Sequence, residues 1–268
     1  MFSTSFTLTL DAADRTELLP TRFLANAAHD LREPLMAMSC LNRALRRRTL
    51  DPEMVHLLVQ QEKIVKSAWR LLEALLMLGR LDSHTAKPQL VDFATAPLLQ
   101  ALELEFAAIA ASKGIELEIA ATDHYVHSDP LLVEQMLRNL LSNAIKYTHC
   151  GKVAFKCACL DTSRVSIEIL DTGVGISPEQ LPRIFEEFHR GGASRSSHEG
   201  CGLGLSIVQR IVRLLGLQLT VRSEVGKGSA FSFSLPAANP AREDDGQPSE
   251  YPWSASLDLY LLGEHAEL

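Results

Sequence analysis

The sequence predicts a multidomain α+β protein in which a helical hairpin, forming a dimeric four-helix bundle, is followed by an α/β-sandwich domain. Two patterns support this fold class. Apolar side chains recur with helical spacing between residues 16 and 82, whereas helical and strand-like segments alternate between residues 89 and 236. With 268 residues, 46% of them hydrophobic and 22% charged, the chain is long enough to bury a core in each domain.

Two long helices are expected at residues 16–50 and 53–82. Between them Asp51 can cap the second helix and Pro52 suits its first turn, and so short a connection makes the helices antiparallel neighbours. The apolar stripe of the second helix is too wide for one partner helix to cover. A second hairpin would complete a four-helix bundle, so we expect a homodimer. The stripe contains Leu57, Leu58, Ile64, Val65, Leu71, Leu72, Leu75, Leu76 and Leu78.

The remaining boundaries follow from changes in composition. Residues 1–15 are left as an N-terminal segment, and the polar stretch 83–88 is expected to be a hinge. The acidic, turn-rich tail at 237–268 is expected to be flexible. Within 89–236 we predict helices at about 95–111, 130–148, 178–189 and 203–216, and strands at 115–120, 151–160, 165–170, 217–223 and 229–235.

Composition excludes several classes of protein. A net charge of -7 argues against a nucleic-acid binder, which needs clustered Lys and Arg. The 5 cysteines are scattered without the paired spacing of a zinc or redox site. The chain has no apolar run of the ~18 residues that a membrane span needs, and its start lacks the layout of a signal peptide. We therefore predict a cytoplasmic protein.

One helix carries three polar residues on the same face. Asn139 and Asn143 are four residues apart and Lys146 follows three residues later, so all three project from one side. Amide carbonyl oxygens suit Mg²⁺, and a lysine is a point charge for a phosphate. A plain solvent-exposed face would explain the same spacing about equally well.

Two glycine-rich turns follow. Residues 165–170 alternate like a half-buried strand and place Asp171 at its end, before Gly173 and Gly175; such a carboxylate can accept a hydrogen bond from the exocyclic amine of adenine. Gly200, Gly202 and Gly204 come just before an apolar helix, whose free N–H groups favour polyphosphate. Each turn is common on its own, so neither is specific evidence.

The order of the motifs is what makes them specific. A helical segment, His29-Asp30-Leu31-Arg32-Glu33-Pro34, precedes the Asn, Asp-Gly and Gly-rich motifs. Together they resemble the catalytic core of bacterial two-component sensor histidine kinases over about residues 20–236, with a Bergerat-type ATP-binding domain shared with gyrase, Hsp90 and MutL proteins. This resemblance implies an ATP-dependent autokinase that phosphorylates His29 and passes the phosphoryl group to an aspartate of a response-regulator receiver domain.

The resemblance also implies site residues, with ATP and Mg²⁺ as cofactors. His29 would be the nucleophile and Asp30 would orient its ring, while Asn143 would ligate Mg²⁺. Phe185 and Phe188 of the family's F box are expected in the core rather than at the ligand. The residues implied to bind ATP are Asn139, Asn143, Lys146, Tyr147, Asp171, Gly173, Gly175, Gly200, Gly202, Leu203 and Gly204.

Glu33 departs from the family pattern, because many members have Thr or Asn four residues after the histidine, where these residues are implicated in dephosphorylating the regulator. Similar H boxes occur in phytochrome-like and hybrid kinases. Any input must come from the first twenty residues, a separate sensor protein or a region outside this sequence. Two alternatives remain open: a degenerate kinase acting as a dimeric scaffold for the regulator, and a Bergerat-type ATPase. The second is disfavoured because those enzymes typically place a glutamate base where Asn139 stands.

Overall fold

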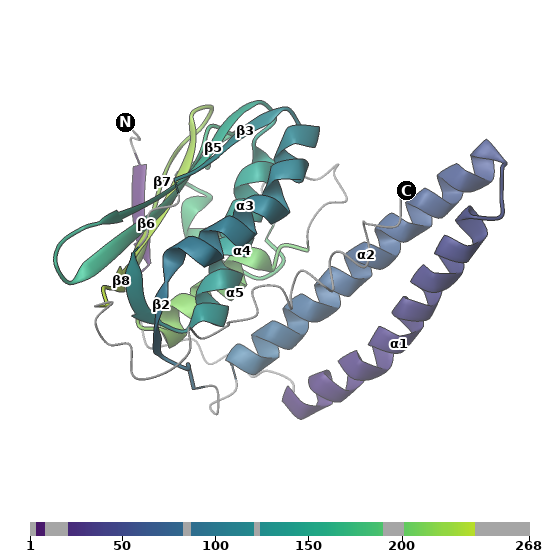
Figure 1. Cartoon of the computed structure of the whole chain (residues 1–268), viewed down its shortest axis with the longest axis horizontal. Helices are drawn as coiled ribbons and strands as arrows, with labels where there is room; N and C mark the ends of the chain where they lie inside the picture. Colours follow the sequence, from purple (N-terminus) through teal and green to yellow (C-terminus); the bar gives the residue numbers. More distant parts are fainter. Residues whose placement is uncertain (1–3, 9–20, 83–86, 121–123, 190–200, 239–268) are drawn as a thin grey trace. The chain divides into compact units, whose positions relative to one another are not determined.

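The computed structural model describes residues 4–8, 21–82, 87–120, 124–189 and 201–238, with the backbone alone for 21–30 (Figure 1). The chain folds as two compact units. The hairpin unit comprises Asp11–Lys87 and Arg183–Arg210. The sheet unit comprises Met1–Leu10, Pro88–Pro182 and Ile211–Leu268.

The hairpin unit contains two long antiparallel helices, α1 (Thr21–Arg46) and α2 (Pro52–Leu81). The predicted cap is confirmed: the Asp51 side chain accepts a hydrogen bond from the Glu53 N–H at 3.0 Å, and Pro52 occupies the first turn. The predicted start of the first helix, at residues 16–20, lies outside the described residues. Helix α1 continues through Pro34 without a break in its assignment.

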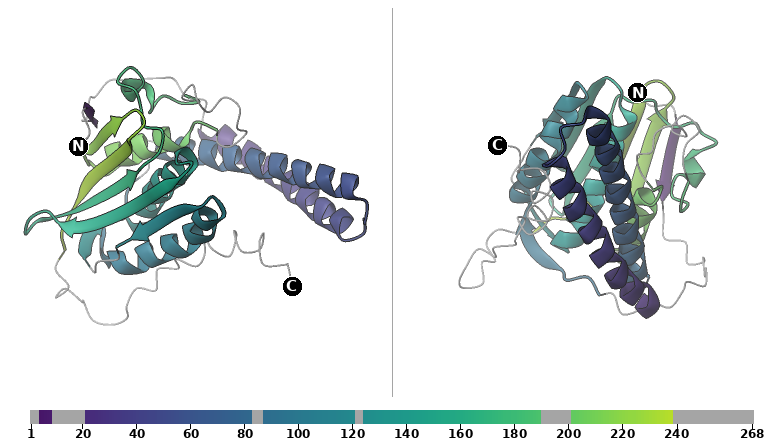
Figure 2. Two further views of the ribbon diagram at one scale, coloured as in Figure 1. Left: turned by 90° about the horizontal axis from the view of Figure 1, so that it is seen from above. Right: turned by 90° about the vertical axis from the view of Figure 1, so that its right-hand side faces the viewer.

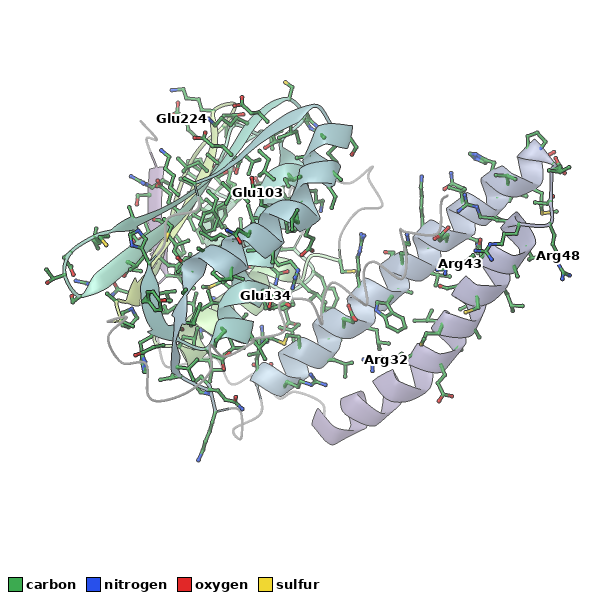
Figure 3. All side chains as sticks on the ribbon, in the orientation of Figure 1. Arg32, Arg43, Arg48, Glu103, Glu134 and Glu224 are labelled. Carbon is green, nitrogen blue, oxygen red and sulfur yellow. The ribbon has the colours of Figure 1, made fainter. Side chains whose placement is uncertain are left out.

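Side chains from both helices fix the register of the hairpin. Asn42, only 2% exposed, donates to the Leu58 carbonyl oxygen at 2.7 Å. Nearer the start of α1, the Arg32 guanidinium lies over the Trp69 ring, 5.7 Å from its centroid (Figure 3). These contacts hold the two helices side by side along most of their length.

Much of the apolar surface of the hairpin is nevertheless exposed. Only Leu58, Val65 and Leu78 are buried among the large apolar residues of α2. An apolar surface of this kind is normally covered by a partner, which supports the predicted dimeric bundle. More than half of each of these side chains is exposed: Leu31, Met36, Leu41, Leu45, Leu57 and Ile64.

The sheet unit is built on a mixed sheet of six strands in the order β1-β7-β8-β6-β5-β3, and a separate pair, β2-β4. Among the strands that the structure describes, only β3 and β5 run parallel to one another. The strands are β1 (Thr4–Leu8), β2 (Val91–Ala94), β3 (Ile115–Ile119), β4 (Tyr125–Ser128), β5 (Gly151–Cys159), β6 (Arg164–Asp171), β7 (Leu219–Glu224) and β8 (Gly228–Pro236). The helices are α3 (Thr95–Ser112), α4 (Pro130–Tyr147), α5 (Gly204–Leu214) and the 3-10 turn η1 (Leu181–Arg183).

The core of this unit lies between the sheet and helices α3 and α4, which pack on one of its faces (Figure 2). Strand β6 alternates as its sequence predicts, with Val165, Ile167 and Ile169 all buried. From α4, Leu137 and Leu141 are wholly buried. The predicted hairpin and α/β domain are therefore both present. None of the described helices combines the length and the hydropathy needed to cross a membrane.

The secondary-structure predictions differ from the structure in several places, and the first helix, expected to reach residue 50, ends at Arg46. The helix predicted at 178–189 is wrong, because only the 3-10 turn Leu181–Arg183 forms there. Pro182 lacks an N–H to donate and disfavours helical backbone at the residue before it, and this short segment does not absorb that cost as the 26-residue helix α1 does at Pro34. Strands β1, β2 and β4 were not expected, since four or five residues are too few to show a clear alternation. The domain boundaries given above stay predictions.

A buried ion-pair cluster joins α3 to α4. Arg138 donates to Glu105 at 3.0 Å and to Glu134, labelled in Figure 3, at 2.7 Å. We expect Arg138→Ala to lower the free energy of unfolding by about 3–5 kcal/mol, because it leaves two partly buried carboxylates unpaired. The comparison is Arg164→Ala, which removes an exposed pair with Asp161 and should lower the free energy of unfolding far less. Urea unfolding curves that coincide for the two variants would contradict this role.

Candidate functional site

Helix α4 carries the three polar residues that the sequence singled out. It starts where the Asp129 side chain accepts hydrogen bonds from the N–H groups of Leu131 and Leu132, both at 3.1 Å. The opposite face of the helix is buried against the sheet. Asn139, Asn143 and Lys146 are each half-buried, so they form one polar strip along the edge of the packed helix. The structure thus brings them together as predicted.

The hydrogen bonds of these three side chains leave the amide oxygens of the asparagines and the ammonium group of the lysine available to a ligand. The Asn139 side-chain amide donates to the Gln135 carbonyl at 2.9 Å, which commits its nitrogen but not its oxygen. Asn143 makes no side-chain hydrogen bond to any other described residue. The Lys146 Nζ lies 4.7 Å from the centroid of the Tyr147 ring and 3.3 Å from its hydroxyl. Tyr147 therefore holds the lysine at the end of the strip.

Asp171, the last residue of β6, is almost completely buried. Its Oδ1 accepts hydrogen bonds from the N–H of Gly173 at 2.8 Å and from the N–H of Ser229 at 3.3 Å. Ser229 lies on β8, which pairs with β6 at this level. Sequence reasoning missed Ser229, because only the pairing of two distant strands places it beside the carboxylate.

The Asp171 carboxyl loses its proton at a pH close to neutral. Burial raises the pKa of Asp171 to about 6, and the hydrogen bonds from Gly173 and Ser229 oppose that rise without cancelling it. With such a pKa the group is about nine-tenths ionised near pH 7. A mostly ionised, oriented carboxylate is a strong acceptor for an amine donor from a ligand.

Gly173 and Gly175 fasten the turn after Asp171 to neighbouring backbone. A Cβ at Gly173 would collide with the Tyr147 carbonyl oxygen, and the Val174 N–H donates to that same oxygen at 3.2 Å. Gly175 has a φ of 69°, which disfavours any side chain, and a Cβ there would collide with the Glu224 carbonyl oxygen. The turn and the end of α4 therefore form a single packed structure.

A magnesium ion bound with a nucleotide would fit the donors of α4. The part of the chain that the structure describes holds no cluster of three His, Cys, Asp or Glu residues able to bind a metal by themselves. Asn143 offers a half-buried amide oxygen that no described donor uses. Mg²⁺ commonly takes one or two protein ligands and completes its shell with water and phosphate oxygens, so a single amide suits it.

The Gly-rich turn belongs to the hairpin unit. Gly200 lies outside the described residues, whereas Gly202 has a φ of 74° and Gly204 begins α5. Leu203 is 1% exposed, and its carbonyl accepts a hydrogen bond from the Ile207 N–H at 3.0 Å, which makes it an anchor of the helix start. Phe185 is buried as expected, but Phe188 is 57% exposed, so its placement in the core was wrong.

The predicted phosphoacceptor lies on α1. The backbone at His29 and Asp30 is helical, while their side chains lie outside the described part of the structure. Glu33 is exposed and follows His29 by four residues, which places the two positions on one face of the helix. Arg32 turns towards α2, where it contacts Trp69 (Figure 3).

Family models match both parts of the chain. Residues 21–84 match the His Kinase A (phospho-acceptor) domain. Residues 128–239 match the Histidine kinase-, DNA gyrase B-, and HSP90-like ATPase family. The first match contains His29 and the hairpin, and the second contains Asn139, Asn143 and Asp171.

Curated relatives include three bacterial sensor proteins. The chain is 32% identical to the autoinducer 2 sensor kinase/phosphatase LuxQ of Vibrio cholerae, over 84% of this chain and 27% of that protein. It is 32% identical to the sensor-like histidine kinase SenX3 of Mycobacterium tuberculosis, over 88% of this chain and 58% of that protein. It is 30% identical to the aerobic respiration control sensor protein ArcB of Escherichia coli, over 96% of this chain and 34% of that protein.

Solved structures of histidine kinases are also similar to this chain. Full-length ShkA in complex with AMPPNP superposes with a TM-score of 0.68 at 28% identity, over 82% of this chain and 47% of that one. The Acinetobacter baumannii histidine kinase AdeS shares the fold, with a TM-score of 0.54 at 22% identity, over 79% of this chain and 98% of that one. The chain spans between about a quarter and three fifths of the length of the curated relatives.

Proposed function

Because this chain belongs to the sensor histidine kinases and carries their phosphoacceptor and ATP-binding domains, we propose that it is an ATP-dependent protein-histidine autokinase. It transfers the γ-phosphoryl group of ATP to His29 and then to an aspartate of a response-regulator receiver domain. The observation that supports this most directly is the presence of His29 on α1 together with the oriented Asp171 carboxylate in the second matched domain.

Adenine would be recognised at Asp171. The N–H of Gly173 and the N–H of Ser229 both bond to Oδ1, which fixes the plane of the carboxylate. A carboxylate fixed in this way accepts a hydrogen bond from the exocyclic amine of adenine and offers no such partner to a ring that carries a carbonyl in that place. This selects ATP over GTP.

Each of the two units carries groups suited to bind phosphate. Lys146 supplies a positive charge for a phosphate, Asn143 ligates Mg²⁺ and Asn139 supports it. When bound, Mg²⁺ offsets the negative charge that spreads over the γ-phosphoryl oxygens during transfer. The start of α5 at Gly204 presents N–H groups of the kind that bind phosphate.

In the transfer step, a neutral imidazole nitrogen of His29 attacks the γ-phosphorus of ATP. A phosphorus–nitrogen bond forms while the bond from the γ-phosphorus to the bridging oxygen breaks, and ADP leaves with that electron pair. Asp30 would accept a hydrogen bond from the other ring nitrogen, which fixes the tautomer and stabilises the proton held there. The regulator aspartate then takes the phosphoryl group from the imidazole.

We expect Asn143→Ala to weaken ATP binding at least about tenfold when Mg²⁺ is present and to change it little when Mg²⁺ is absent, since the variant removes one ligand of the ion. Ser142→Ala is the matched control, because Ser142 is an exposed neighbour on the same helix. The measurement is a nucleotide titration of each protein with and without Mg²⁺. An equal loss of affinity in both conditions would remove Asn143 from the metal site.

The partners follow from the hairpin. The phosphoacceptor family implies a dimer and a response regulator. For this chain we propose a homodimer that buries the exposed apolar residues of α1 and α2, a receiver domain as acceptor, and a separate sensor protein as one possible source of input. A cytoplasmic location stays a prediction.

Glu33 bears on whether the protein also removes phosphate from its regulator. Its exposed carboxylate shares a helix face with His29, and it would repel an anionic phospho-aspartate by on the order of 1 kcal/mol, whereas Thr or Asn could hydrogen-bond the attacking water without that penalty. We expect Glu33→Thr or Glu33→Asn to speed dephosphorylation of the regulator about fivefold, measured as loss of label with ADP and Mg²⁺ present. Glu53→Gln, at the other end of the hairpin, is the control. Slower loss in either Glu33 variant would show that the carboxylate assists the reaction.

The test of the proposed function is incubation with ATP labelled on its γ-phosphate. Phosphohistidine is lost in acid and stable in alkali, so the expected product is an acid-labile phosphoprotein whose label passes to a receiver domain. Binding of a receiver without any labelling would favour the scaffold. Release of inorganic phosphate without a labelled protein would favour the ATPase.

A further inference from the structure

Strand β1 joins a sheet whose other strands all follow the hairpin in sequence. It pairs antiparallel with β7 through five residue pairs, from Thr4↔Ser223 to Leu8↔Leu219, and lies at the edge of the sheet (Figure 1). The chain therefore starts in the sheet unit, leaves it to form α1 and α2, and returns at β2.

The side chains of β1 alternate as an edge strand requires. Phe6 and Leu8 are half-buried and lie opposite Val221 and Leu219, which are both fully buried, whereas Ser5 and Thr7 face solvent. Cross-strand apolar pairs of this kind stabilise a sheet in addition to its backbone hydrogen bonds. Strand β1 is thus attached to the sheet unit by specific packing.

The antiparallel hairpin places both of its connections at one end. Arg32 of α1 contacts Trp69 of α2, so the first residue of α1, Thr21, and the last residue of α2, Leu81, lie at the same end of the hairpin. His29 is three residues from Arg32 in the direction of that end. The phosphoacceptor therefore lies near the end from which both connections to the sheet unit leave.

The lengths of the two connections limit how far apart the residues that they join can lie. Residues 9–20 join Leu8 to Thr21 and, whatever their conformation, span at most about 45 Å. Residues 82–90 join Leu81 to Val91 and span at most about 35 Å. A single connection lets one body pivot about its attachment, whereas a second connection restricts that rotation when it is attached at a different place, here at β1 of the six-stranded sheet rather than at β2 of the separate pair.

We propose that β1 is a positioning element for phosphoryl transfer: its pairing with β7 provides a second tether between the ATP-binding domain and the His29 end of the hairpin. This inference rests on the proposed function. Two tethers raise the local concentration of bound ATP at the phosphoacceptor without adding any contact to the nucleotide. Phe6 and Leu8 anchor the tether, and residues 9–20 set its length.

Strand β1 could act as a tether, or it could only cover the edge of the sheet, and these two roles lead to different predictions. Both roles require β1 to pair with β7, since an open edge strand also exposes unpaired backbone groups. Only the tether depends on the length of the connection. Inserting about 24 Gly and Ser residues within 9–20 triples that length while leaving β1 able to pair, and should lower the local concentration up to about fivefold.

The experiment measures the labelling rate at saturating ATP and the affinity for ATP in the full chain. We expect the double variant Phe6→Asp and Leu8→Asp, and separately the insertion, to slow labelling about two- to fivefold while ATP affinity stays within about twofold of wild type. Ser5→Asp with Thr7→Asp is the matched control, because these side chains face solvent. A Thr7→Cys and Thr220→Cys pair, opposite one another in the register, should form a disulfide and keep the wild-type rate.

The outcomes separate the possible roles of β1. Unchanged labelling by the insertion variant, with slow labelling by the Phe6 and Leu8 variant, would overturn the tether in favour of an edge cover. Faster labelling by both would overturn it in favour of a strand that holds the kinase inactive.

A readout that needs no activity separates this inference from the proposed function. Spin labels at the exposed positions Ala37 of α1 and Lys227 of the sheet unit, in a chain with its native cysteines replaced by alanine and diluted with unlabelled chain, report the spread of distances. We expect the insertion to widen that spread, and an unchanged spread would overturn the tether. A wild-type chain that fails to label overturns the proposed function alone.

Discussion

Replacing His29 by Gln is expected to abolish labelling from γ-labelled ATP while leaving the affinity for ATP within about threefold of wild type. Glutamine fills a similar volume but has no nitrogen lone pair that can attack phosphorus. Affinity should persist because Asn139, Asn143 and Asp171 lie in the other matched domain. The control is His56→Gln, which changes an exposed histidine of α2.

Acid-labile label on the His29→Gln protein would refute the assignment of the nucleophile. The same variant also decides which subunit is phosphorylated. When it is mixed with Asn143→Ala protein, each kind of subunit lacks one half of the reaction. Label on the Asn143→Ala chain in such a mixture means transfer between subunits, whereas the absence of label means transfer within one subunit.

Asp171→Asn is expected to have the second largest effect on activity, with ATP affinity lowered about 10- to 100-fold. The amide keeps the shape of the side chain, and its oxygen can still accept from the Gly173 N–H, so the fold should remain intact. What is lost is the charged acceptor for the exocyclic amine of adenine. The control is Asp161→Asn, an exposed aspartate in the turn before β6, which should not change the affinity.

Asp171→Asn should also raise the free energy of unfolding when no nucleotide is bound. The folded protein raises the pKa of Asp171 from 3.8 to about 6, so it favours the protonated carboxyl. The contribution of this group to stability is therefore fully present below about pH 4 and is lost as pH rises through 6, at a total cost of about 3 kcal/mol. We expect Asp171→Asn to be more stable than wild type by up to that amount near pH 7.5, and no more stable near pH 4.

The affinity of wild type for ATP should depend on pH in the opposite sense. Adenine binds best to the ionised carboxylate, so affinity should fall as pH drops from about 7 to about 5, while Asp171→Asn should show no such fall. Titrations of both proteins across this range measure the difference. Parallel curves would mean that another group controls the dependence.

Local sequence patterns predicted the elements whose cause is local. The cap at Asp51, the alternation of β6 and the polar strip on α4 each depend on residues within a few positions of one another, and the structure confirms all three. The order of the site motifs then identified the family, because that order is a property of the sequence alone.

The features that sequence reasoning missed depend on distant parts of the chain. Ser229 reaches Asp171 only because β8 pairs with β6, 58 residues apart at this point. Strand β1 is defined by its pairing with β7, across more than two hundred residues, and its five residues carry too little pattern to indicate a strand. The helix wrongly expected at 178–189 shows a different error, since the apolar spacing was given more weight than Pro182.

The close approach of Gly173 to the Tyr147 carbonyl limits how drug resistance could arise in this protein. An inhibitor that occupies the adenine position would lie beside residue 173, where a larger side chain would be the simplest way to exclude it. That route is closed, because any side chain there collides with the end of α4 and would displace Tyr147 and Lys146 with it. A substitution of Asp171 itself would remove the acceptor that adenine is proposed to use, so it would weaken ATP binding as well as inhibitor binding.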